Sequence, residues 1–145
     1  MADHNERWVL NRLIEMCRDE EQTLRYLSDR VEDPSVRRLL AGLAQRRARF
    51  AADLVPHAQR LGGYEPHDGT RRGAWHRRWM SLRDSLLRAD DQRRVAEAEY
   101  EEQRILTMYD GALEEILPPD TRSVVEHQAA ETKRDHDQVQ AFLTH

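Results

Sequence analysis

Hydrophobic residues recur three or four positions apart along four long stretches of the chain, which is the spacing of amphipathic α-helices. The stretches are separated by Asp33-Pro34, Gly62-Gly63 and Pro118-Pro119. Proline suits the first turn of a helix, and glycine often follows the last one. The pattern therefore predicts helices at about 6–31, 34–62, 90–116 and 119–144, with a shorter helix at about 73–88.

Each predicted helix has one apolar stripe that needs partners. The stripes are Leu10, Leu13, Cys17, Leu24, Leu27 and Val31; Val36, Leu39, Leu43, Phe50, Leu54 and Leu61; Val95, Ala98, Ile105, Tyr109, Ala112 and Ile116; and Val125, Thr132, Val139 and Leu143. The two proline turns predict antiparallel hairpins, and about 28 residues connect them, enough to cross the bundle from end to end. We therefore expect one all-α domain, residues 1–145, with a ferritin-like antiparallel four-helix bundle and a long crossover that contains the fifth helix.

Composition narrows the class of protein. The chain has 145 residues, of which 34% are charged and 39% hydrophobic, with a net charge of −4. It contains no apolar run of about 18 residues that could cross a membrane, and its polar N-terminus lacks the core of a secretory signal. Cys17 is the only cysteine, which excludes an intrachain disulfide and a cysteine-based zinc site. We expect a cytoplasmic protein, and the negative charge argues against a dedicated nucleic-acid binder.

Polar residues interrupt the middle of all four stripes. The interruptions are Glu20 and Glu21, Arg46 and Arg47, Glu102, and His136. Glu21 lies 13 residues before Pro34 and Arg47 lies 13 after it. Glu102 lies 16 residues before Pro118, and His136 lies 17 after Pro119. Equal distances from a turn mean equal heights in a hairpin, so we expect these charges to meet in one interior layer.

A buried layer of charge is costly unless it is paired. One interpretation is an ion-pair layer, in which Arg47 neutralises Glu21 and His136 bonds to Glu102. The other is a single transition-metal ion, iron, manganese or zinc, bound by Glu21, Glu102 and His136. We favour the ion pairs, because an arginine beside a carboxylate supplies the positive charge that a metal would supply.

Several runs of sequence resemble a known bacterial family. They are LNRLIEM (10–16), RARFAADL (47–54), RLGG (60–63), WHRRWMSLR (75–83), AEYEEQRILTMYDGALEE (98–115), LPPDTRSVVEHQ (117–128) and KRDHDQVQ (133–140). Over about Leu10–Leu143 the chain is similar to the uncharacterised domain of unknown function 2383 family. The resemblance implies a ferritin-like four-helix bundle and brings no established activity.

The wider ferritin-like group allows a sharper comparison. Its di-iron members carry a Glu on two helices and Glu-x-x-His on the other two. This chain has Lys133-x-x-His136 in the last helix, and Arg46, Arg47 and Phe50 where the second helix would need the motif. We therefore expect no complete di-iron centre.

The crossover carries basic and aromatic residues together: Arg71, Arg72, Trp75, Arg77, Arg78 and Trp79. We expect the tryptophan face to dock on the bundle, or to form the contact of a homodimer. Nucleic-acid binding through this segment is a weaker alternative. No serine–histidine–aspartate arrangement and no glycine-rich phosphate loop is present. The sequence thus favours a non-enzymatic structural or interaction role, with metal binding in the core as the alternative.

Overall fold

The computed structural model describes residues 2–63, 79, 82–83, 85–86 and 88–143. Within these residues all regular structure is helical. The four helices are α1 (Ala2–Arg30), α2 (Pro34–Arg60), α4 (Asp91–Leu113) and α5 (Pro119–Leu143). Each agrees with a predicted helix to within a few residues, although α1 begins earlier and α4 ends earlier than the pattern indicated. None of these helices is long and apolar enough to cross a membrane.

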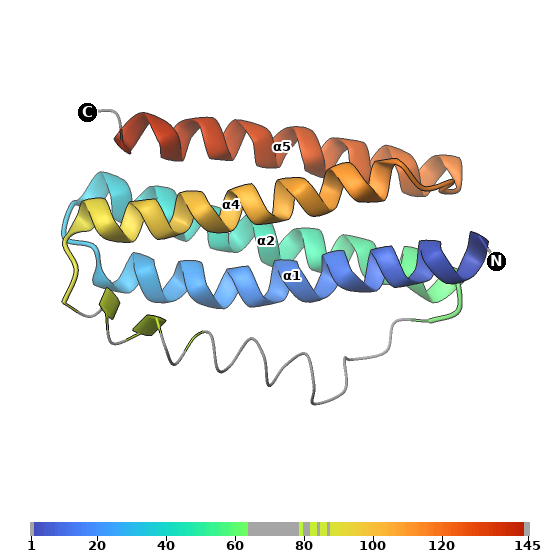
Figure 1. The fold of residues 1–145 in the computed structure, drawn as a ribbon, viewed down its shortest axis with the longest axis horizontal. Coiled ribbons are helices and arrows are strands. Elements are labelled where there is room, and N and C mark those ends of the chain that lie inside the picture. Colours follow the sequence, from blue (N-terminus) through green and yellow to red (C-terminus); the bar gives the residue numbers. More distant parts are fainter. Residues whose placement is uncertain (1, 64–78, 80–81, 84, 87, 144–145) are drawn as a thin grey trace.

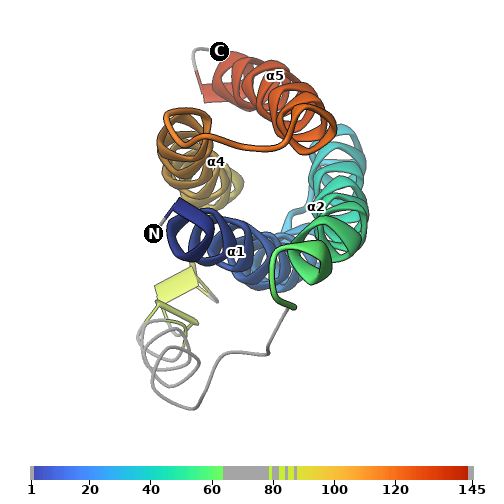
Figure 2. The ribbon, with the colours of Figure 1, turned by 90° about the vertical axis from the view of Figure 1, so that its right-hand side faces the viewer.

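The helices form a bundle of two antiparallel hairpins. The first hairpin is α1 and α2, and the second is α4 and α5 (Figure 1). Seen along the bundle, α1 lies beside α2 and α4. The helix α5 lies opposite α1 and also neighbours α2 and α4 (Figure 2). The helix α2 ends at one end of the bundle, and α4 begins at the other (Figure 1).

The turns are fixed by side-chain hydrogen bonds to the backbone. Asp33 caps α2 by accepting from the backbone N–H groups of Ser35 and Val36, as an N-cap aspartate does. The first residue of α4, Asp91, accepts from the N–H groups of Glu32 and Asp33 at 2.9 Å each. The start of the second hairpin is therefore bound to the turn of the first.

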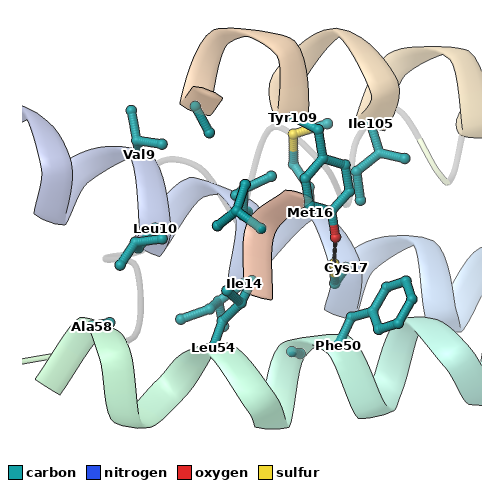
Figure 3. Packing of buried hydrophobic residues seen from close by; sticks show 14 of the residues in the cluster. Val9, Leu10, Ile14, Met16, Cys17, Phe50, Leu54, Ala58, Ile105 and Tyr109 are labelled. Atoms are coloured by element: carbon teal, nitrogen blue, oxygen red, sulfur yellow. Dashed lines mark hydrogen bonds between the residues drawn. The ribbon is translucent and has the colours of Figure 1, made fainter. Parts of the chain in front are cut away.

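The hydrophobic core is divided into two clusters. One contains Leu10, Leu13, Phe50, Leu54, Ile105 and Tyr109, and lies toward the start of α1 (Figure 3). The other contains Leu24, Leu27, Leu40, Leu43, Val95 and Val139, and lies toward the end of α1. The charged residues between Cys17 and Leu24 on α1, and at the same height on the other helices, lie between the two clusters.

The predicted stripes are largely buried, with one clear correction. Ile116, predicted as the last core residue of its stripe, is 79% exposed, because α4 ends at Leu113 and the chain has already left the helix. In α2, Leu40 is fully buried and Leu39 is only partly buried. At this one position of the stripe, the core residue of α2 is therefore Leu40 and not Leu39, while Val36 and Leu43 on either side are buried as predicted.

The predicted helix at 73–88 lies largely outside the described residues. Of its aromatic residues, Trp79 is described, and its ring meets the ring of Tyr26 edge-on at 4.7 Å. Trp79 and Leu82 pack against the second core cluster, and Leu86 is buried within it. This end of the connection therefore docks on the bundle.

Candidate functional site: a buried arginine–carboxylate layer

One arginine of α2, Arg47, is completely buried in the middle of the bundle. Its Nη2 atom donates to Oε2 of Glu102 on α4 at 2.5 Å and lies 3.3 Å from Oδ2 of Asp135 on α5. Its Nε atom lies 3.9 Å from Oε1 of Glu20 on α1. Its guanidinium carbon is 5.3 Å from the centre of the Phe50 ring, within the range of a cation–π contact. A single side chain thus connects α2 with all three other helices.

The four charged residues lie in the inward-facing seams of their helices. Buried residues in each seam follow one another mostly in alternating steps of three and four, as in coiled-coil packing. The seams run through Leu10, Leu13, Cys17, Glu20, Leu24, Leu27 and Val31; Val36, Leu40, Leu43, Arg47, Phe50 and Leu54; Val95, Ala98, Glu102, Ile105, Tyr109 and Ala112; and Thr121, Val125, Gln128, Thr132, Asp135 and Val139. Each helix therefore places one charge at the same height of the interior.

Arg46 completes what we call the arginine–carboxylate layer. It lies at the rim and holds Asp135 with two hydrogen bonds, from Nε at 3.0 Å and from Nη2 at 2.7 Å. The layer then contains two arginines, Arg46 and Arg47, and three carboxylates, Glu20, Glu102 and Asp135. With all of them ionised, one negative charge would remain without a positive partner.

Glu20 is the carboxylate of the layer whose negative charge is compensated least. Its side chain is buried, and neither of its oxygens has a hydrogen-bond partner among the described residues. Burial raises the pKa of Glu20 well above its ordinary value of 4.5, and the carboxylates of Glu102 and Glu101 raise it further. The attraction of Arg47 acts in the opposite direction but is weaker. These surroundings favour the protonated, neutral form of Glu20.

Two residues of the predicted layer lie elsewhere. Glu21 is partly exposed and accepts a hydrogen bond from Arg25, one turn further along α1, at 2.9 Å. His136 lies at the edge of the bundle, where its Nε2 atom is 2.9 Å from Oε1 of Glu99, and so it bonds to Glu99 in place of the predicted Glu102. Each lies one position after the residue that does enter the layer. One residue turns a helix by about 100°, which is enough to move the side chain out of the seam.

The three residues predicted as metal ligands bond to separate partners in the structure. Glu21 bonds to Arg25, Glu102 to Arg47, and His136 to Glu99. The described part of the chain holds no group of three or more histidine, cysteine, aspartate or glutamate side chains arranged to bind a metal ion. The carboxylates that do converge surround the guanidinium of Arg47, which occupies the place that a cation would need.

A second chain of polar contacts crosses the interior one to two helical turns away from the layer. The hydroxyl of Tyr109 donates to Oε1 of Gln128 at 2.7 Å and lies 3.8 Å from the sulfur of Cys17 (Figure 3). Gln128 in turn donates to the backbone carbonyl of Phe50 at 3.3 Å. Burial raises the pKa of Cys17 to about 12, so its thiol is protonated and unreactive at neutral pH.

Replacing Tyr109 with phenylalanine should lower the free energy of unfolding by about 1 kcal/mol. The change keeps the ring in the core and removes the hydroxyl, which leaves Oε1 of Gln128 without its donor. Urea denaturation followed by circular dichroism measures the effect. Replacing the exposed Tyr100 with phenylalanine is the control, and an equal loss in both variants would contradict the assigned hydrogen bond.

The crossover residues singled out from the sequence cannot be placed in the same way. Arg71, Arg72, Trp75, Arg77 and Arg78 lie outside the described residues. Trp79, described above, packs against α1 through Tyr26. The expectation that this face docks on the bundle therefore has support at Trp79, and the interaction with nucleic acid stays a prediction.

Comparison with protein families shows the family to which the chain belongs. Residues 6–115 match a model described as a domain of unknown function, DUF2383. The chain belongs to the DUF2383 family. The matched DUF2383 region includes most of α1 and all of α2 and α4, and with them Glu20, Arg47 and Glu102. Asp135 lies beyond it in α5. The comparison with curated proteins finds no significant match.

Proposed function

We propose that this DUF2383 protein has a non-enzymatic structural or interaction role, and that the arginine–carboxylate layer holds its four helices in register. One observation carries the proposal: Arg47 contacts a carboxylate from each of the other three helices. A helix that slid along its neighbours would pull its charge into one of the two hydrophobic clusters. Since an unpaired buried charge is costly, the layer penalises every such shift.

The chemistry of the layer supports this assignment over catalysis. A catalytic acid or base needs access to a substrate, and the residues at the centre of the layer, Glu20, Arg47 and Glu102, are almost completely buried. Arg47 is permanently charged under physiological conditions, so it serves well as a fixed cation and poorly as a proton carrier. The long connection between two antiparallel hairpins also supports the ferritin-like assignment. In this bundle, Arg47 acts as an internal counter-ion among the carboxylates.

Metal content tests the proposal directly. The protein should be purified without a histidine tag and analysed for iron, manganese and zinc by elemental analysis. We expect less than about one tenth of an equivalent of each metal, because Arg47 already neutralises the carboxylates. A stoichiometric metal that disappears in His136→Ala or Glu102→Gln, and persists in the control Glu126→Gln at an exposed position of α5, would favour a metalloprotein and overturn the proposal.

A further inference from the structure

A pocket lies between the neighbouring helices α2 and α5 (Figure 2). Its volume is about 580 Å³, a size found in binding sites for small molecules. Toward the middle of the bundle, the two helices are joined by the hydrogen bonds of Arg46 to Asp135. Toward the end of α2 they are joined by Arg60, whose Nη2 atom lies 2.6 Å from Oδ2 of Asp120. The pocket therefore lies along the seam between two ion pairs.

The lining of the pocket combines apolar side chains with a buried amide. Phe50 of α2 and Val124 of α5 supply the apolar surface. Gln128 also lines the pocket and is only 1% exposed. Its amide is held in one orientation, because its Oε1 accepts from Tyr109 and its Nε2 donates to the backbone carbonyl of Phe50. An amide nitrogen carries two hydrogens, so Gln128 can donate the second to an oxygen of a ligand.

Two opposite charges line the α2 side of the pocket. They belong to Arg49 and Asp53, which lie four residues apart, or about 6 Å along the helix. In the described part of the chain, neither side chain forms a hydrogen bond or an ion pair. The histidine on the α5 side, His127, lies 3.7 Å from Glu131 of its own helix. The pocket thus offers one cation and one anion to a ligand.

We propose that this pocket binds a small zwitterion, an α-amino acid with an apolar side chain. Arg49 and the second amide hydrogen of Gln128 bind the carboxylate of the ligand, and Asp53 binds its ammonium group. The apolar side chain of the ligand lies on Phe50 and Val124. A ligand with a single charge satisfies only one of the two charged side chains, whereas a zwitterion satisfies both. The inference goes beyond the proposed function and does not depend on the arginine–carboxylate layer.

Three related probes separate the two charges of the ligand. L-phenylalanine carries both charges, N-acetyl-L-phenylalanine carries only the negative one, and L-phenylalaninamide carries only the positive one. Each is titrated at pH 6 into the ¹⁵N-labelled full chain, and amide chemical shifts give the affinity. We expect each singly charged probe to bind at least about tenfold more weakly than L-phenylalanine, because it lacks one charge-assisted hydrogen bond.

Two variants assign each charge of the ligand to one side chain. Arg49→Met should weaken the binding of L-phenylalanine at least about tenfold, but should not weaken that of L-phenylalaninamide, which has no carboxylate. Asp53→Asn should weaken the binding of L-phenylalanine to a similar extent, but not that of N-acetyl-L-phenylalanine. The controls Arg38→Met on α2 and Asp110→Asn on α4 make the same substitutions at exposed positions away from the pocket, and should leave all three affinities unchanged.

Folding does not limit the test, because all four substituted residues are exposed. Far-ultraviolet circular dichroism should show the helix content of the wild type in every variant. The inference is wrong if neither L-phenylalanine nor L-leucine shifts the amide signals at concentrations up to about 10 mM. Equal affinity for the three probes would exclude recognition of both charges. Binding of L-phenylalanine that survives Arg49→Met and Asp53→Asn would place the site elsewhere, and would also contradict the inference.

Discussion

Replacing Arg47 with methionine should lower the free energy of unfolding by about 3–5 kcal/mol, the usual effect of removing one partner of a buried ion pair. Methionine fills a similar volume but leaves Glu102 without its donor. It also leaves Glu20 and Asp135 facing Glu102 without the central cation. The loss should appear in urea denaturation at pH 7, measured by circular dichroism. We expect the loss to shrink toward pH 5, because protonation then removes part of the uncompensated charge.

The neighbouring arginine provides a matched control. Arg46→Met removes two hydrogen bonds to Asp135, but Arg46 reaches solvent and Asp135 keeps its contact with Arg47. We expect a loss of about 1 kcal/mol for that variant. Equal losses for Arg46→Met and Arg47→Met, or a loss below about 1 kcal/mol for Arg47→Met, would show that the centre of the layer does not hold the helices together.

Replacing Glu20 with glutamine should stabilise the protein at pH 8, because the wild type must there hold a proton that the unfolded chain releases, at a cost of about 1.4 kcal/mol for each pH unit above the ordinary pKa until the folded pKa is reached. Glutamine has the shape of the protonated acid and no charge, and it balances the layer at two arginines and two carboxylates. Most substitutions in a protein core destabilise the fold. A stabilising effect of Glu20→Gln would therefore indicate that Glu20 is uncompensated in the wild type.

The effect should depend on pH in a defined direction. The pKa of Glu20 is raised in the folded state, so the folded protein holds a proton that the unfolded chain releases. The contribution of Glu20 to stability is therefore complete below its ordinary pKa of 4.5 and is lost as the pH rises through the folded pKa. Urea curves at pH 5, 6.5 and 8 should show a growing advantage of Glu20→Gln over the wild type.

The adjacent residue again offers a control. Glu21→Gln removes a charge one position away, from a partly exposed pair with Arg25, and should change stability by less than about 0.5 kcal/mol at each pH. A stabilisation by Glu20→Gln that is the same at pH 5 and pH 8 would contradict a proton held on Glu20. So would a destabilisation at pH 8.

The helices and their two hairpins follow from sequence alone because their signals are local. Proline and glycine mark the turns, and apolar spacing marks the faces, as the burial of Leu10, Leu13, Cys17, Leu24 and Leu27 confirms. The end of α4 was missed because Ile116 continues the apolar spacing beyond the helix. Spacing alone does not show that the chain leaves the helix at Leu113, four residues before Leu117 enters the core.

The membership of the layer was predicted in part. Arg47 and Glu102 lie between apolar neighbours in the sequence, and both are buried in the structure. A gap of seven residues between apolar positions can, however, be divided as three and four or as four and three. The gap from Cys17 to Leu24 allows Glu20 or Glu21, and the gap from Thr132 to Val139 allows Asp135 or His136. Extending the alternation of steps along the whole of α1 and α5 selects Glu20 and Asp135. The partners of Arg47 depend on packing between helices, which no single-helix pattern contains.

The hydrogen bonds of Asp91 have a consequence for how the molecule opens. The backbone amides of Glu32 and Asp33 donate to a side chain 59 and 58 residues further along the chain. Their hydrogens can exchange with water only when Asp91 moves away from the turn, whether by separation of the hairpins or by fraying of the first turn of α4. These two amides, on an otherwise exposed turn, are therefore natural reporters of the docking of one half of the molecule on the other.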